Sequence, residues 1–103
     1  MSDTAREFFG TLDTRLDTSR LEGQTLSYRF DIAGAGSWVV SVADGVLSVA
    51  EGDHAAETVL RMREETFLRL LRGEQSPAAA FMMGRIKIEG DMGQALKLKE
   101  LFF

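Results

Sequence analysis

The chain has no cysteine among its 103 residues, and it has one histidine. A protein without thiols cannot form disulfides, zinc–thiolate sites or cysteine nucleophiles, so those kinds of chemistry are excluded. The histidine, His54, lies in an acidic stretch with Glu51, Asp53 and Glu57. Metal binding and acid–base catalysis need several ligands or a partnered nucleophile that converge on one point. We therefore expect His54 to lie in a solvated loop.

The chain also lacks a surplus of positive charge, because its formal net charge is -4. This argues against nucleic-acid binding and against adsorption driven by anionic lipid, although it leaves room for transient membrane contact through apolar groups. No apolar run approaches about 20 residues, and Met1 to Gly10 lacks the apolar core of a signal peptide. We expect a cytoplasmic protein, and the absence of asparagine together with an excess of arginine over lysine suggests a bacterial gene.

What remains is typical of one globular domain over residues 1–103, since no repeat or linker divides the chain. The segment from Thr4 to Glu7 has the pattern of a helix capping box. Apolar residues then recur at spacings of three and four, namely Ala5, Phe8, Phe9, Leu12 and Leu16. This predicts a first helix from Ala5 to Asp17 that packs through one apolar stripe.

After Gly23 the apolar period changes from helical spacing to two. Apolar and polar residues alternate from Thr25 to Ile32, which predicts a half-buried strand. The glycines of Gly34-Ala35-Gly36 indicate a turn into the next strand. We predict a three-residue loop that pairs Ile32 with Trp38 and Phe30 with Val40, because a two-residue loop would put the apolar side chains on opposite faces.

A second turn is indicated by Asp44-Gly45, a strong signal for a two-residue hairpin loop. This loop would pair Val42 with Leu47 and Val40 with Val49. All four side chains would then lie on one face of a three-stranded meander.

Five further elements are predicted downstream. They are a strand over 58–63, a helix over 64–72 stopped by Gly73, a short helix from Ser76-Pro77 to Gly84, a strand over 85–89, and a last helix opened by Gly90 and Asp91. The order predicts an α+β domain with a five-stranded, mainly antiparallel sheet. Helices would cover one face of the sheet, and the other face would meet water.

Nothing in this pattern indicates catalysis, because the carboxylates are scattered and Gly34-Ala35-Gly36 lacks the context of a phosphate loop. We therefore expect no enzyme and no cofactor or metal. The unusual feature is the last helix, whose apolar residues span about 220 degrees where packing on one sheet needs about 100. The excess must cover a ligand, a partner or a second core layer. The residues alone leave these three open.

The run from Ser76 to Leu98 resembles the sterol carrier protein type 2 family position by position. The resemblance lies in its phenylalanine, its Gly84-Arg85-Ile86-Lys87-Ile88 strand, its Met92-Gly93 and its Leu-Lys-Leu helix. Upstream, Trp38 to Val42 followed by Asp44-Gly45 resembles the family's tryptophan strand, and Phe67 to Gly73 is similar to its glycine-terminated helix. Together the matches span about Gln24 to Leu101.

The resemblance implies an apolar tunnel between the sheet and its helices that binds a lipid without a catalytic residue. The residues that it would place along the tunnel are Trp38, Val40, Phe67, Leu71, Phe81, Met82, Ile86, Ile88, Leu96 and Leu101. The last three residues carry no peroxisomal signal, which argues against a peroxisomal location. Together with the bacterial-looking composition, this favours a fatty acid, acyl-CoA or isoprenoid quinone over a sterol-like ligand. The alternative is an interaction or dimerisation module, or an accessory subunit of a lipid- or quinone-modifying enzyme. The expected state is a monomer or weak homodimer.

Overall fold

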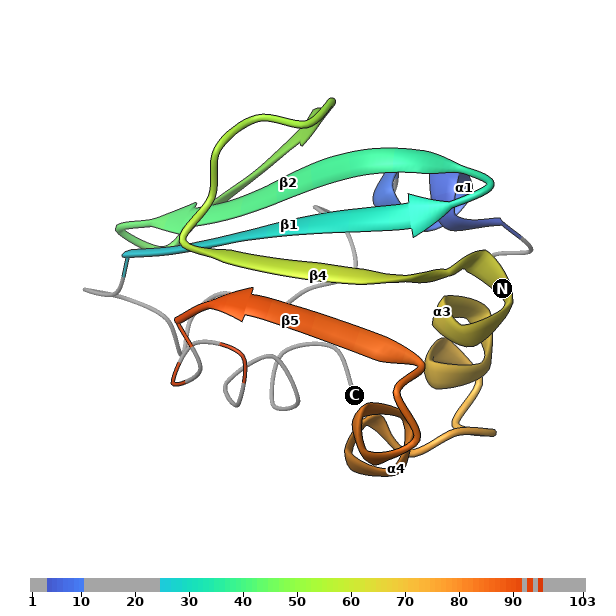
Figure 1. Cartoon of the computed structure of the whole chain (residues 1–103). Helices are drawn as coiled ribbons and strands as arrows, with labels where there is room; N and C mark the ends of the chain where they lie inside the picture. The colour runs from blue at the N-terminus through green and yellow to red at the C-terminus, as the bar shows by residue number, and fades with distance from the viewer. Residues whose placement is uncertain (1–3, 11–24, 92, 94, 96–103) are drawn as a thin grey trace.

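The structure is a computed structural model that describes residues 4–10, 25–91, 93 and 95 (Figure 1). The elements are α1 (Ala5–Gly10), β1 (Thr25–Ala33), β2 (Gly36–Ala43), β3 (Val46–Glu51), β4 (Thr58–Arg63), α3 (Glu64–Leu71), α4 (Pro77–Met82) and β5 (Ile86–Gly90). None of the helices in this described part is long and apolar enough to cross a membrane.

The five strands form one sheet in the order β3-β2-β1-β4-β5. The β1–β4 pair is parallel, and the other three pairs are antiparallel. Because β1 and β4 are parallel, the chain must cross from β3 back over the sheet to begin β4. The α+β class and the five-stranded, mainly antiparallel sheet with its covering helices are confirmed (Figure 1).

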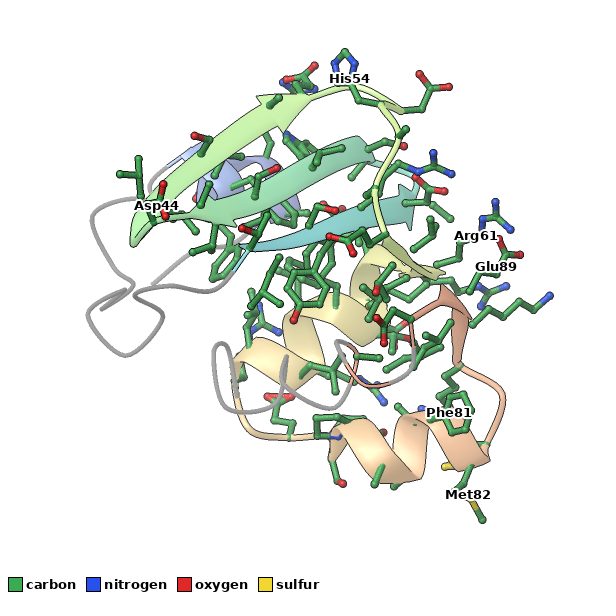
Figure 2. The ribbon with its side chains drawn as sticks, turned by 90° about the vertical axis from the view of Figure 1, so that its left-hand side faces the viewer. Asp44, His54, Arg61, Phe81, Met82 and Glu89 are labelled. Atoms are coloured by element: carbon green, nitrogen blue, oxygen red, sulfur yellow. The ribbon has the colours of Figure 1, made fainter. Side chains whose placement is uncertain are left out.

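The β2–β3 hairpin has the predicted two-residue turn. Asp44 and Gly45 have φ of 51° and 77°, which is the left-handed conformation that both central positions of a type I′ turn require. Val42 pairs with Leu47 and Val40 with Val49, as predicted. Asp44 lies at the far end of the sheet from α4 (Figure 2).

The predicted β1–β2 register is wrong by two residues. Phe30 pairs with Trp38 and Tyr28 with Val40, and the turn closes one residue earlier, through a hydrogen bond from the Ala35 amide to the Ile32 carbonyl. Gly34, with φ of 91°, takes the left-handed position of this turn. The second glycine, Gly36, is therefore part of β2. A shift of two keeps every side chain on its predicted face.

The downstream elements match their predicted positions closely. Ser76 caps α4 by accepting a hydrogen bond from the Ala79 amide, with Pro77 at the first helical position. Gly73 and Gly84, at φ of 74°, terminate α3 and α4. The predicted first helix is observed over α1, and its continuation to Asp17 lies outside the described residues. The same holds for most of the last helix, of which Gly93 and Ala95 are described.

Candidate functional site on the inner sheet face

One face of the sheet is apolar across all five strands. Because paired residues share a face, the register identifies its members strand by strand. The buried apolar residues on this inner face are Leu26, Tyr28, Phe30, Ile32, Trp38, Val40, Val42, Leu60, Met62 and Ile86. The half-buried Leu47, Val49 and Ile88 extend it to both edges. The inner face is therefore one continuous apolar surface.

Helix α1 places an aromatic side chain at the centre of this surface. The Phe9 ring stacks on the Trp38 indole at a centroid distance of 4.8 Å and on the Phe67 ring of α3 at 5.4 Å. It also contacts Phe30 at 5.2 Å and its neighbour Phe8 at 5.3 Å. We call these five rings the ring cluster. It fills the space between β1, β2 and the two helices, so that part of the inner face carries packed side chains.

A polar point lies at the end of the apolar surface where β1 and β4 begin to pair. The Thr58 hydroxyl donates to the Asp91 carbonyl at 3.1 Å, and the Asp91 amide donates to the Glu57 carbonyl at 3.1 Å. Burial, reinforced by the charges of Asp91 and Glu57, raises the pKa of Tyr28 to about 12. The phenol is therefore held neutral, and it presents a polar group at one end of an apolar layer.

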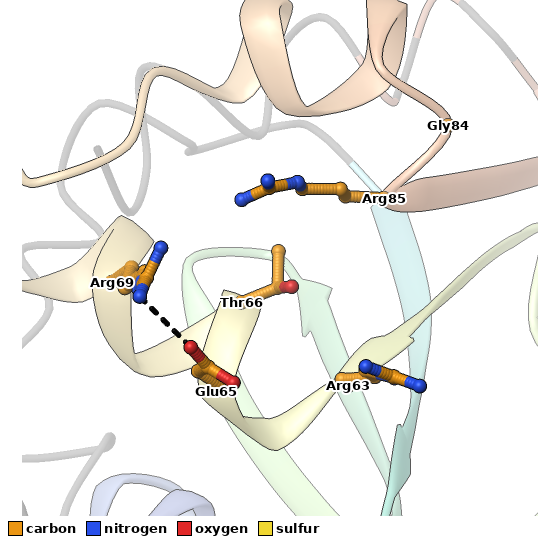
Figure 3. A pocket seen from close by; sticks show the side chains of 6 residues that line it. All are labelled: Arg63, Glu65, Thr66, Arg69, Gly84 and Arg85. Atoms are coloured by element: carbon orange, nitrogen blue, oxygen red, sulfur yellow. Dashed lines mark ion pairs between the residues drawn. The ribbon is translucent and has the colours of Figure 1, made fainter.

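Hollows open at several places on the surface of the described residues. A hollow of about 420 Å³ opens at the rim of the inner face, where Phe9, Trp38, Leu47 and Val49 line it together with the Arg6–Glu51 ion pair. A second, of about 520 Å³, lies between α3 and the start of β5 and is lined by arginines (Figure 3). A third, of about 680 Å³, adjoins it along the ends of β1 and β4. The first is the one that reaches the ring cluster.

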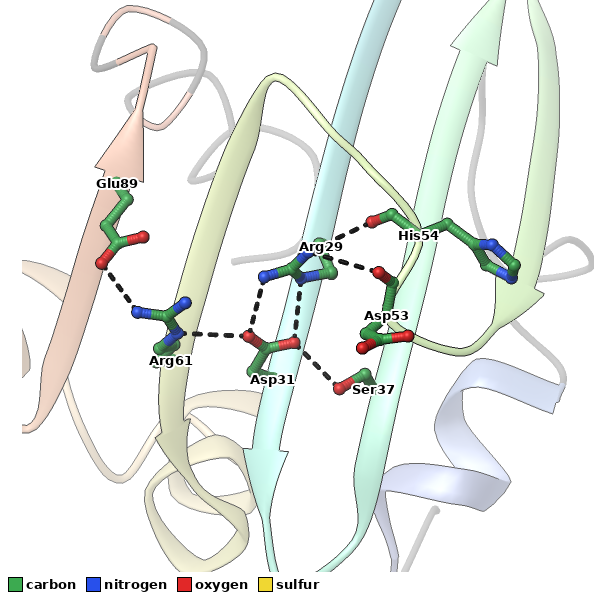
Figure 4. Close-up of polar contacts among 7 residues, drawn as sticks. All are labelled: Arg29, Asp31, Ser37, Asp53, His54, Arg61 and Glu89. Atoms are coloured by element: carbon green, nitrogen blue, oxygen red, sulfur yellow. Dashed lines mark hydrogen bonds and ion pairs between the residues drawn. The ribbon is translucent and has the colours of Figure 1, made fainter.

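The outer sheet face carries a chain of charged contacts. Asp31 accepts hydrogen bonds from Ser37, Arg29 and Arg61, and Arg61 also pairs with Glu89 at 2.7 Å (Figure 4). Partial burial by itself would raise the pKa of Asp31, but these hydrogen bonds outweigh it and hold the pKa below 3.8. All these groups are satisfied by one another across the four strands β2, β1, β4 and β5. The network ties the sheet together, and its geometry suggests no reacting group.

The loop between β3 and β4 crosses this outer face. Its Asp53 and His54 carbonyls accept hydrogen bonds from Arg29 (Figure 4). The His54 side chain is exposed, and its ring lies 3.1 Å from the Glu51 carbonyl. The prediction that His54 lies in a solvated loop is confirmed.

The predicted tunnel residues fall into three groups. Trp38, Val40, Phe67 and Ile86 are buried on the inner face or against it, and Leu71 and Ile88 are half-buried beside them. Phe81 and Met82, on α4, are 44% and 83% exposed, and Figure 2 shows Met82 pointing away from the sheet. Leu96 and Leu101 lie outside the described residues.

The candidate set omitted the residues of α1. Phe8 and Phe9 contact more of the predicted site rings than any predicted residue of α4 does. Their spacing had marked them as core-facing, which was the available signal. A helical period shows which face of a helix is buried, but it does not show which strand that face will meet.

Comparison with known proteins identifies the fold. The family model of the SCP-2 sterol transfer family matches residues 10–103. The chain belongs to this family. The solution structure of sterol carrier protein domain 2 of Helicoverpa armigera superimposes on this SCP-2 domain with a TM-score of 0.72 at 26% identity, covering 91% of this chain and 81% of that one. The family resemblance noted in the sequence is therefore confirmed.

Curated relatives of this SCP-2 domain are longer proteins. Hydroxysteroid dehydrogenase-like protein 2 of Xenopus tropicalis is 30% identical over 104 residues, which is 97% of this chain and 25% of that protein. Sterol carrier protein 2 of Homo sapiens is 41% identical over 66 residues, covering 63% of this chain and 12% of that protein. The chain spans about a quarter or less of the length of the curated relatives that it matches.

Proposed function

We propose that this SCP-2 domain binds one apolar lipid between the inner sheet face and the helices, and carries it without chemical change. The observation that supports this is the continuous apolar inner face with its ring cluster and rim hollow. The ligand class is a long-chain fatty acid, an acyl-CoA, a sterol-like lipid or an isoprenoid quinone. The relative named sterol carrier protein 2 agrees with this class.

Apolar burial supplies enough free energy for such a function. A chain of about 10 methylenes offers up to about 8 kcal/mol before ordering costs, which supports roughly micromolar affinity. Because apolar burial is non-directional, chemically different lipids can use the same surface. The ring cluster occupies the space over Trp38, so a lipid that reaches Val40 and Phe67 must displace the Phe9 ring. The rim hollow beside Trp38 is the route that we propose.

The residues predicted from the sequence to line a tunnel are the proposed lipid contacts. Trp38, Val40, Phe67, Leu71, Ile86 and Ile88 would contact the lipid chain. Phe81 and Met82 would contact it at the α4 end, as would Leu96 and Leu101 from beyond the described residues. The proposed carrier has no catalytic group and no cofactor, and it works in the cytoplasm as a monomer or weak homodimer.

Trp38 fluorescence provides the test, because it is the sole tryptophan and stacks on Phe9. Titration with palmitate, a long-chain acyl-CoA and a quinone analogue should give a saturable change with a midpoint in the micromolar range or below. Native mass spectrometry of freshly purified protein should show added mass from a co-purified lipid. The proposal fails if a dozen lipids give no saturable response and the protein carries no added mass.

A second candidate is an interaction module or an accessory part of a lipid- or quinone-modifying enzyme. Two observations favour it. Phe81, Met82 and Met83 are exposed on one short helix. The relative named for its likeness to a hydroxysteroid dehydrogenase is about four times as long as this chain. Light scattering distinguishes the candidates, since a module that dimerises through α4 becomes monomeric when Met82 and Met83 are changed to serine.

A further inference from the structure

The end of α4 exposes three large apolar side chains in sequence. Phe81, Met82 and Met83, the α4 tip, are 44%, 83% and 60% exposed. Single exposed apolar residues are common on protein surfaces, whereas three together at one helix end mark a contact surface. Among the described large hydrophobic residues, the other exposed one is Val46, at the β2–β3 hairpin.

Two cationic hollows adjoin the α4 tip. Arg63, Arg69 and Arg85 line the first, together with Glu65, which pairs with Arg69 at 2.9 Å (Figure 3). Arg63 and Arg85 also line the second, which adds Arg61, Lys87 and Asp31. Five basic side chains thus face two acidic ones. Within the described part of the chain, Arg63 and Arg85 pair with no carboxylate.

The chain holds the apolar tip and the hollows in a fixed relation. The Arg85 amide donates to the Ala80 carbonyl at 2.8 Å, and the Gly84 amide donates to the Phe81 carbonyl at 3.0 Å. This is the Schellman pattern, with Gly84 in the left-handed conformation that it requires. Arg85 therefore leaves α4 beside the tip and enters β5 directly. The backbone hydrogen bonds therefore fix the α4 tip next to Arg85, which lines both hollows.

We infer that the α4 tip and its flanking arginines dock this domain on an anionic phospholipid bilayer. The inference rests on the proposed lipid carriage, which requires the domain to meet membranes. Apolar side chains at the tip would enter the boundary between headgroups and acyl chains, while Arg63, Arg85 and Lys87 reach lipid phosphates. Proteins that bind membrane surfaces commonly combine apolar insertion with electrostatic attraction in this way.

Charge complementarity selects the bilayer over a second copy of the chain. In a two-fold dimer the same patch would face itself, so the unpaired arginines would be brought toward their own copies. The net charge of -4 argues against adsorption of the chain as a whole on anionic lipid, but the charge is unevenly distributed. Since the total is negative despite this basic cluster, the remainder of the chain is acidic. An anionic bilayer therefore repels the rest of the surface and attracts this end, which orients the domain.

Vesicle flotation tests the inference on the full chain. We expect binding to vesicles that contain phosphatidylserine, weaker binding to phosphatidylcholine alone, and loss of the difference at high salt. The double variant Arg63→Gln/Arg85→Gln should weaken binding by about five-fold per charge. The double variant Met82→Ser/Met83→Ser should abolish most of the binding that the apolar side chains provide.

The matched controls are Val46→Ser, an exposed apolar residue at the other end of the sheet, and Arg72→Gln, an arginine that lines neither hollow. Both should bind like the parent chain.

Three results would overturn the inference. One is equal binding of the parent and the tip variants to anionic vesicles, and another is equal loss in the controls. The third is a dimer in light scattering that the tip variants convert to a monomer. Failure of lipid carriage is recognised separately through Trp38. Because Met82 is one of the proposed lipid contacts, this measurement uses Met83→Ser and the double arginine variant. Both should keep the fluorescence response to soluble palmitate while the transfer rate from vesicles falls, whereas a failed carrier gives no palmitate response in any variant, the parent included.

Discussion

Gly90 is required by the close approach of two backbones. It ends β5 with φ of 98°, and a Cβ at this position would collide with the Glu57 carbonyl oxygen. That carbonyl accepts the Asp91 amide and so fixes the chain where it leaves the sheet.

We therefore expect Gly90→Ala to cost more than 3 kcal/mol, since both the conformation and the space oppose it. Gly73→Ala is the matched control, because Gly73 has φ of 74° but nothing within 4 Å of the added carbon. It should cost about 1 kcal/mol. Urea denaturation of the two variants measures the difference, and equal costs would refute the role of the Glu57 contact.

Tyr28 provides a titration that reports directly on the buried polar point. It is the sole tyrosine, so tyrosinate absorbance is its own signal. We expect an apparent pKa of about 12, against 10.0 for a free phenol. Because the pKa of Tyr28 is raised in the folded chain, the neutral phenol contributes fully to folding stability below pH 10. As the pH rises toward 12, this contribution to the free energy of unfolding is lost by about 1.4 kcal/mol per pH unit. Tyr28→Phe should remove this part of the alkaline loss of stability. A midpoint near 10 in the folded protein would contradict the burial.

Helix α1 is short, and its contribution comes from its rings. Phe9 is 3% exposed and contacts four aromatic neighbours, so Phe9→Ala should destabilise the domain by about 3–5 kcal/mol. If the lipid chain replaces this ring over Trp38, palmitate should restore much of the loss and should bind the variant more tightly than the parent.

Leu26→Ala controls for general loss of core, because Leu26 is buried on the same sheet face and belongs to no ring contact. Its cost of about 2–5 kcal/mol should not be reduced by palmitate beyond the gain seen in the parent. Chemical denaturation with and without palmitate measures both. Equal rescue of the two variants would mean that the lipid does not take the place of Phe9.

The elements show where sequence patterns suffice and where they do not. The Asp44-Gly45 turn was predictable, because both residues tolerate the left-handed conformation that a two-residue hairpin needs. The first turn offers two glycines, and either can supply a left-handed position. The structure uses Gly34 for the turn and leaves Gly36 in β2, where an added Cβ would lie 3.4 Å from the Trp38 ring. Local propensity cannot choose between such glycines, since the choice depends on packing.

The candidate site was predictable in its strands more than in its helices. A period of two assigns each strand residue to a face, so Trp38, Val40 and Ile86 were placed correctly on the inner side. Helix residues depend on how each helix is oriented over the sheet, which is set by tertiary contacts. Phe81 was expected to face the ligand with Phe67, yet Phe67 is buried and Phe81 is about half exposed.

For the whole molecule, lipid binding and folding stability should be linked. A ligand that binds the folded chain alone stabilises it by about 2.7 kcal/mol at 100 times its Kd. For a domain of this size that corresponds to a rise in Tm of roughly 10 °C. Thermal unfolding with increasing palmitate should show this rise, and octanoate, which buries fewer methylenes, should give a smaller one. A Tm independent of palmitate concentration would count against internal binding.

The parallel pairing of β1 with β4 sets an order for folding. The β1–β2–β3 meander closes through short turns, and hairpins of this kind form in microseconds. Tyr28 meets Thr58 across the parallel pair, so that contact must close a far longer loop. Until it does, one edge of β1 is unpaired, and an unpaired edge can recruit another chain. Amides of the β1–β2 ladder should therefore gain protection from hydrogen exchange first during refolding, and those of β5 last. A synthesising ribosome releases the strands in that same order.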